Sequence, residues 1–134
     1  MKSMGKRVPS LFLLLVILQA MHSIEEYTGK LWDNFPPATF LTGLISNDLE
    51  TGFLITNIGI FAVGMACWFL IVHRRSPLSQ RIIWIWIIIE LINGLVHPAW
   101  SLMQQSYTPG VITAPFLLIT ALLLIKATSS KLPS

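Results

Sequence analysis

The sequence predicts an all-α protein, a bundle of four transmembrane helices forming a single membrane domain over residues 1–134. Hydrophobic residues make up 54% of the chain and charged residues only 11%, whereas an ordinary soluble domain has about 25% charged residues. Four apolar runs each approach the length of about 20 residues that a spanning helix needs. The basic residues lie between these runs, as they do in a multi-pass membrane protein.

The expected spans cover about residues 9–27, 52–73, 81–104 and 109–127. Residues 28–51 form one longer loop, whereas 74–80 and 105–108 are short links of the kind that join antiparallel neighbours. The single cysteine, Cys67, lies inside an apolar run, so it permits no internal disulfide and no cysteine metal cluster. The chain therefore reads as one compact set of helices held together by packing.

The basic residues predict an orientation, because lysine and arginine concentrate on the cytoplasmic side of a membrane. Only Lys30 falls on the opposite side of the expected bundle, next to three acids. The eight basic residues that share one side are Lys2, Lys6, Arg7, Arg74, Arg75, Arg81, Lys126 and Lys131. An N-in, C-in topology follows. No nucleic-acid partner is expected, because these residues do not form a basic patch interleaved with aromatic side chains.

Residues 1–20 also have the pattern of a secretory signal, with a basic start, an apolar stretch from Leu11 to Leu18 and then Gln19-Ala20. Cleavage after Ala20 would leave three spans. Apolar residues continue at Met21 and Ile24, which favours a retained first helix.

Acids and histidines are unusually concentrated in two of the apolar runs. Five of the nine such residues lie there: His22, Glu25 and Glu26 in the first span, and Glu90 and His97 in the third. In lipid these side chains persist mainly when they face a cavity, pair with each other or hold an ion. The spacing of three and four residues places both acids of the first span on the face of His22.

Helix geometry predicts that these residues meet. His22 lies 15 residues past Arg7 and His97 lies 16 past Arg81, so a rise of about 1.5 Å per residue puts the two histidines at one level. Asn57, Asn93 and Thr113 add polar groups near that level from three spans. We expect a pocket open to the non-cytoplasmic side, above a sealed inner half that contains the isoleucine-rich run 82–89.

Imidazole and carboxylate groups are ligands for zinc, iron and manganese. We predict a divalent metal held by His22, Glu26 and His97, with Glu25, Glu90 and Tyr107 as catalytic groups. A metal-free site, in which a glutamate and a histidine exchange protons, is the alternative chemistry. Simpler explanations are that the first-span acids are solvated at the interface, and that Glu90 only bonds neighbouring helices together.

These residues predict an enzyme that acts on an apolar or lipid-like small molecule within the bilayer. Two other classes of function stay open. One is a component of proton- or cation-coupled transport that works as a homo-oligomer, and the other is a structural membrane subunit whose buried polar groups serve assembly.

Two motifs carry a family resemblance. Residues 22–26 read H-x-x-E-E, and residues 107–113 read Y-x-P-G-x-x-T, with His97 between them. The combination resembles the HXXEE-domain family of small bacterial integral membrane proteins, a functionally uncharacterised family. The resemblance implies a location in the bacterial cytoplasmic membrane and supplies positions, without an activity. We also expect Pro109 to open the fourth helix, where free N–H groups attract an anion.

Overall fold

The computed structural model describes residues 5–129, which are all-α. Four helices are long, namely α1 (Val8–Thr28), α4 (Leu49–Cys67), α5 (Ser79–Gln104) and α6 (Ala114–Ser129). Helix α4 continues directly into a π-helical turn, η1 (Trp68–Val72). Three segments, Val8–Thr28, Leu49–Val72 and Ser79–Gln104, are long and apolar enough to cross a membrane, and α6 is a shorter apolar helix. This composition is consistent with an integral membrane protein.

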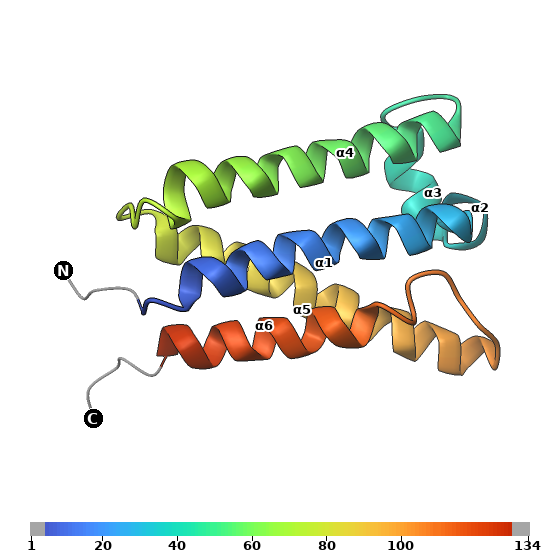
Figure 1. Ribbon diagram of the computed structural model, residues 1–134. Coiled ribbons are helices and arrows are strands. Elements are labelled where there is room, and N and C mark those ends of the chain that lie inside the picture. Colours follow the sequence, from blue (N-terminus) through green and yellow to red (C-terminus); the bar gives the residue numbers. More distant parts are fainter. Residues whose placement is uncertain (1–4, 130–134) are drawn as a thin grey trace.

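Helix α1 lies at the centre of the arrangement, between α4 and α6, with α5 on the far side in this view (Figure 1). It packs on both neighbours, while α5 packs mainly on α6. Helix α4 reaches α5 through η1, and only Gly52, Phe53 and Gly64 of α4 are buried. The rest of α4, from its start to η1, therefore packs mostly against α1 and against two short helices.

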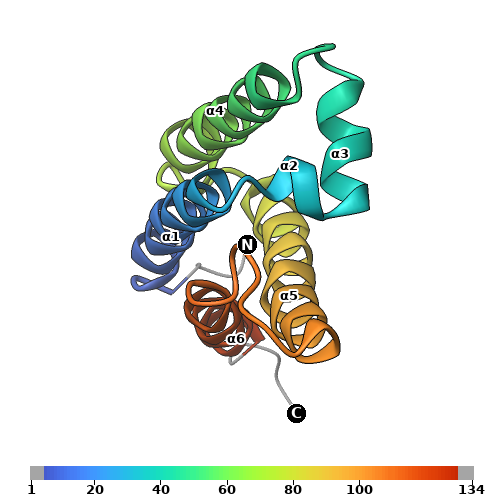
Figure 2. The same cartoon turned by 90° about the vertical axis from the view of Figure 1, so that its right-hand side faces the viewer.

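Two short helices occupy the segment that was expected to be a loop. They are α2 (Leu31–Asn34) and α3 (Pro36–Gly43), which lie across one end of α1 and α4 (Figure 2). The two prolines at the start of α3 fit there because the first turn of a helix needs no N–H donors. Asp48 then caps α4 by accepting a hydrogen bond of 3.2 Å from the Thr51 N–H.

The basic residues gather at the other end of the bundle, where α1 begins, α4 turns into α5 and α6 ends (Figure 1). Among the described residues, those at this end are Lys6, Arg7, Arg74, Arg75, Arg81 and Lys126, and Lys30 lies at the opposite end. Lys2 and Lys131 lie outside the described residues. The segregation of charge is confirmed for the described part, and the membrane side that each end faces stays a prediction.

Apolar side chains fill the half of the bundle nearer the basic end. Phe12, Leu15, Ile83, Leu117 and Leu124 have no exposed surface, and they belong to one cluster built by α1, α5 and α6. Burial of this kind stabilises the fold by about 25 cal/mol per Å² of apolar surface. The predicted sealed half is therefore packed with side chains, and the polar residues are left to the other half.

The predicted start of the fourth helix was wrong by five residues. Helix α6 begins at Ala114, and Pro109 lies in the turn before it. Gly110 explains the difference, because its φ of 91° lies in the left-handed region that a right-handed helix excludes. The turn formed by residues 109–113 carries part of the site described below.

Gly94 brings α5 and α6 close together beside that site. A Cβ at this position would lie 2.7 Å from Leu118 Cβ and 3.1 Å from its Cα.

We expect Gly94→Ala to lower the free energy of unfolding in detergent micelles by about 1–3 kcal/mol. Gly59→Ala is the matched control, because no described heavy atom lies within 4 Å of its added Cβ. It should leave stability unchanged or raise it by up to about 1 kcal/mol. Equal losses from both variants would contradict this packing.

Candidate metal centre

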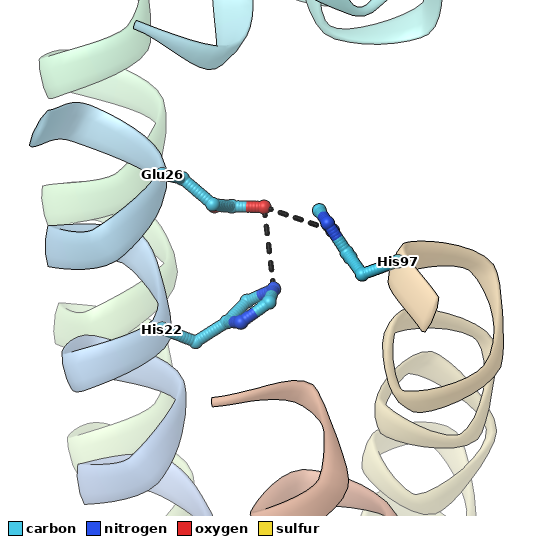
Figure 3. A group of neighbouring side chains, drawn as sticks. All are labelled: His22, Glu26 and His97. Carbon is cyan, nitrogen blue, oxygen red and sulfur yellow. Dashed lines mark ion pairs between the residues drawn. The ribbon is translucent and has the colours of Figure 1, made fainter. Parts of the chain in front are cut away.

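Three buried side chains from two helices converge at one point. Glu26 Oε1 lies 3.3 Å from His22 Nε2, one turn away on α1, and 3.2 Å from His97 Nε2 on α5 (Figure 3). His22 is fully buried, His97 is 3% exposed and Glu26 is 7% exposed. One ligand atom from each residue lies within 4.8 Å of the other two, so the group could hold a metal ion. The predicted meeting of the histidines is confirmed, with their ring centroids 4.6 Å apart.

The hydrogen on the His97 ring is placed by the turn before α6. His97 Nδ1 lies 2.7 Å from the Pro109 carbonyl oxygen. A carbonyl oxygen can only accept, so Nδ1 must carry the hydrogen and donate it. In the neutral imidazole, Nε2 then presents a lone pair toward Glu26.

The hydrogen on the His22 ring is placed through a longer chain of bonds. Thr113 Oγ1 lies 2.7 Å from His22 Nδ1 and donates its only hydrogen to Glu25 Oε2, 2.5 Å away. It can therefore only accept from His22, which fixes a hydrogen on Nδ1. Glu25 also accepts from the backbone N–H groups of Ile112 and Thr113 and from the Tyr107 hydroxyl. Four donors fill the acceptor sites of an ionised carboxylate.

The anion expected at the start of the fourth helix is thus Glu25 of the same chain, bound by the free N–H groups ahead of α6. In their neutral forms, both histidines therefore point Nε2 lone pairs into the space beside Glu26 Oε1. His22 Nε2 is buried and has no hydrogen-bond partner among residues 5–129. Three electron-pair donors converge there, and a cation would satisfy all three.

Gly110 gives the two rings room to meet. A Cβ on this residue would lie 2.5 Å from His97 Nδ1 and 2.7 Å from His22 Cε1. The neighbouring Pro109 packs against Gly29 at the end of α1, where a Cβ would overlap the proline ring. Sequence reasoning singled out Pro109 and Gly110 as features of a helix start. Their contacts with the histidines could not be inferred without the turn.

The other predicted site residues fall into two groups. Thr113 and Tyr107 contact Glu25, as described above. Glu90, Asn93 and Asn57 lie instead in a separate polar network, in which Asn93 Nδ2 donates to Glu90 Oε2 at 3.2 Å. Sequence reasoning missed two members of that network, Gln19 and Ser23, which were visible only as neutral polar residues within an apolar run.

The fold and site define a helical protein with three segments long and apolar enough to cross a membrane and a buried His/Glu/His group. Residues 13–125 match the family described as "Protein of unknown function with HXXEE motif", and the chain belongs to that family. No curated protein and no solved structure matches the chain. The structure assigns a contact to each lettered residue of the two motifs, which join the end of α1 to the turn before α6.

The pKa of the exposed Tyr107 hydroxyl is sensitive to its contact with Glu25, which lies between α1 and the turn before α6. Partial burial raises the pKa of Tyr107 above its ordinary value of 10.0, and the hydrogen bond to Glu25 and the charge of that carboxylate raise it further. Glu25→Gln should lower the Tyr107 pKa toward 10.0, because a neutral amide no longer repels the phenolate. Tyrosinate absorbance measures this in a Tyr27→Phe background, which leaves one tyrosine. Glu50→Gln in that background is the control, and an equal effect there would contradict the Glu25 contact.

Proposed function

We propose that this protein is a membrane-embedded metalloenzyme whose divalent metal is bound by His22, Glu26 and His97. The observation that carries the proposal is that both Nδ1 atoms face acceptors, so that the neutral rings carry their hydrogens on Nδ1 and leave two Nε2 lone pairs beside a carboxylate. Ligand histidines in metalloproteins generally donate their second N–H to a carbonyl or carboxylate partner in this way. The bond from His97 to the Pro109 carbonyl oxygen matches that pattern, and the bond from His22 to the Thr113 hydroxyl leads on to the Glu25 carboxylate.

Two of the three spacings between ligand atoms fit a tetrahedral metal ion. Two ligands on a tetrahedral zinc ion, with bonds of about 2.0–2.1 Å, lie about 3.3 Å apart. Glu26 Oε1 lies 3.3 Å and 3.2 Å from the two Nε2 atoms. Such ligands direct their lone pairs at the ion and not at each other, which accounts for the buried His22 Nε2 without a hydrogen bond.

The ligand set also favours catalysis over a purely structural role. Two histidines and one carboxylate are the ligand set of catalytic zinc sites and of non-haem iron oxygenases, in both of which a coordination position stays open. A metal held in this way supplies a Lewis acid and an activated water. Glu25 and Tyr107 then act through Thr113 and His22, by holding the ligands in place.

The surroundings of His97 support an apolar substrate. The Phe35 and Trp100 rings pack against each other at an angle of 40° with centroids 4.6 Å apart, and they lie 6.3 Å and 6.5 Å from the His97 ring. Aromatic faces beside a metal ligand favour the binding of an apolar or lipid-like molecule. Such a molecule is concentrated in the bilayer that the apolar helices indicate.

We propose further that the basic end of the bundle faces the cytoplasm, so that the site lies toward the outer side. A Cys67→Ser background allows single cysteines to be labelled in intact cells with a membrane-impermeant maleimide. Asn47→Cys, between α3 and α4, should be labelled, whereas Gln80→Cys, at the start of α5, should be labelled only after lysis. The reverse pattern would overturn the proposed topology.

Metal analysis tests the ligand set directly. Protein purified in detergent should carry about one zinc, iron or manganese ion per chain. His97→Ala should lose it, because a ligand is gone, while His73→Ala, which changes an exposed histidine at the basic end, should retain it. A wild-type protein without metal after growth with each ion, or a His97→Ala variant with full occupancy, would overturn the proposal.

Two variants at Thr113 test how His22 is held. Thr113→Val removes the hydroxyl that accepts from His22 Nδ1, and it should weaken metal binding by about 10–100-fold. Thr113→Ser keeps the hydroxyl and should bind nearly as the wild type does. The proposed enzymatic activity is tested by incubating the metal-loaded protein with total lipid extract. The wild type should convert a component of the extract, and His97→Ala should not. Metal binding without any conversion would support a metal site but contradict an enzymatic function.

A further inference from the structure

A second buried polar network lies deeper in the bundle than the metal ligands and involves none of them. Its centre is Glu90 on α5, which has no exposed surface. Gln19 on α1, 5% exposed, faces its carboxyl group, and Asn93 Nδ2 donates to Glu90 Oε2 at 3.2 Å. Both ion pairs found among the described residues belong to Glu26, so no cationic side chain there pairs with Glu90.

A carboxyl group in such a place must be neutral or bind a cation, because an unpaired buried charge is very costly. The titratable groups on the surrounding helices do not supply that cation. The groups nearest to Glu90 lie toward the end of the bundle opposite the basic residues, where they bond to each other and to the turn before α6. They are His22, Glu25 and Glu26 on α1 and His97 on α5. Glu50 lies in the first turn of α4, and the cations of α5 and α6, Arg81 and Lys126, lie at the basic end.

The Gln19 amide distinguishes between the charged and neutral forms of Glu90. In either orientation of the amide, one of its atoms lies 2.8 Å from Glu90 Oε2 and 3.2 Å from Oε1. If that atom is Nε2, Gln19 donates to an ionised Glu90. In that orientation Gln19 Nε2 also lies 3.3 Å from Asn93 Nδ2, so two donors face each other without an acceptor between them. The amide oxygen then faces Ser23 Oγ, whose one hydrogen is donated to Asn57, so the bond between Gln19 and Ser23 is lost as well.

If the atom facing Glu90 is the amide oxygen, every neighbour is satisfied provided that Glu90 carries a proton. Asn93 Nδ2 then donates to Gln19 Oε1 at 3.3 Å. Gln19 Nε2 donates to Ser23 Oγ at 3.4 Å, and Ser23 donates to Asn57 Oδ1 at 2.7 Å. Asn57 in turn donates to the Phe53 carbonyl oxygen at 3.0 Å. With the Glu90 O–H as its first donor, this chain of hydrogen bonds runs in one direction from α5 through α1 to α4.

We propose that Glu90 is a proton-binding site that links three helices: its neutral carboxyl group donates to Gln19, and loss of the proton reverses the Gln19 amide and breaks the chain to α4. The ligand is a single proton. The site matters for α4 in particular, because so little of that helix is buried and the Ser23–Asn57 bond ties it to α1. Nothing in this site requires the metal, so the proposal stands apart from the proposed enzyme.

Infrared spectroscopy of the full chain in detergent, with metal removed by a chelator, tests the proposal. A protonated buried glutamate gives a carboxylic-acid C=O stretching band, which should be present at neutral pH and lost in Glu90→Gln. Glu50→Gln, which changes an exposed glutamate, is the matched control and should keep the band. Absence of the band from the wild type, or its survival in Glu90→Gln, would overturn the proposal.

A second variant keeps the test decisive if Glu90→Gln fails to fold. Gln19→Leu leaves Glu90 in place but removes the oxygen to which it donates, so the band should move to higher wavenumber. An unmoved band would show that Glu90 does not donate to Gln19. Added sodium chloride provides the last check, because loss of the band at constant pH would identify a bound cation in place of the proton and refute this assignment.

Discussion

The hydrogen bonds at the two Nδ1 atoms determine what the rest of the site can do. The Pro109 carbonyl oxygen and the Thr113 hydroxyl both accept, so both imidazole rings turn their Nε2 lone pairs toward Glu26. Thr113 can act as an acceptor only because Glu25 takes its hydrogen. Each member of the group therefore depends on a partner outside it, and the chemistry at Nε2 is set by contacts on the opposite side of each ring.

The two sequence motifs form a single structural unit because those contacts cross between them. The end of α1 supplies His22, Glu25 and Glu26, and the turn before α6 supplies the groups that hold them. The turn fits only because Gly110 has a positive φ and no side chain, which lets it lie against both rings. Helix α5 adds His97 from outside this unit, and it packs closely on α6 at Gly94, three residues before that histidine.

Sequence patterns predicted the features that follow from regular helices. Long apolar runs gave three of the spans closely, and the constant rise per residue placed His22 and His97 at one level. Patterns failed where irregular backbone decides the outcome. The turn at residues 109–113 was read as helix, and α2 and α3 are too short for periodicity to reveal. Glu90 and His97 share a stripe on α5, yet two turns of helix separate them, so they join different networks.

Charge balance connects the two networks. Glu25, which is only partly buried, accepts from four donors and is ionised, and Glu26 must also be ionised to act as a metal ligand, so the network around the proposed metal site carries two negative charges. A divalent cation at the proposed site makes that network neutral, whereas a monovalent cation leaves one charge over. An ionised Glu90 would add a third negative charge nearby, and the proton proposed on Glu90 avoids that charge. The two proposals are independent in their tests, but the same constraint of neutrality in a low-dielectric interior favours both.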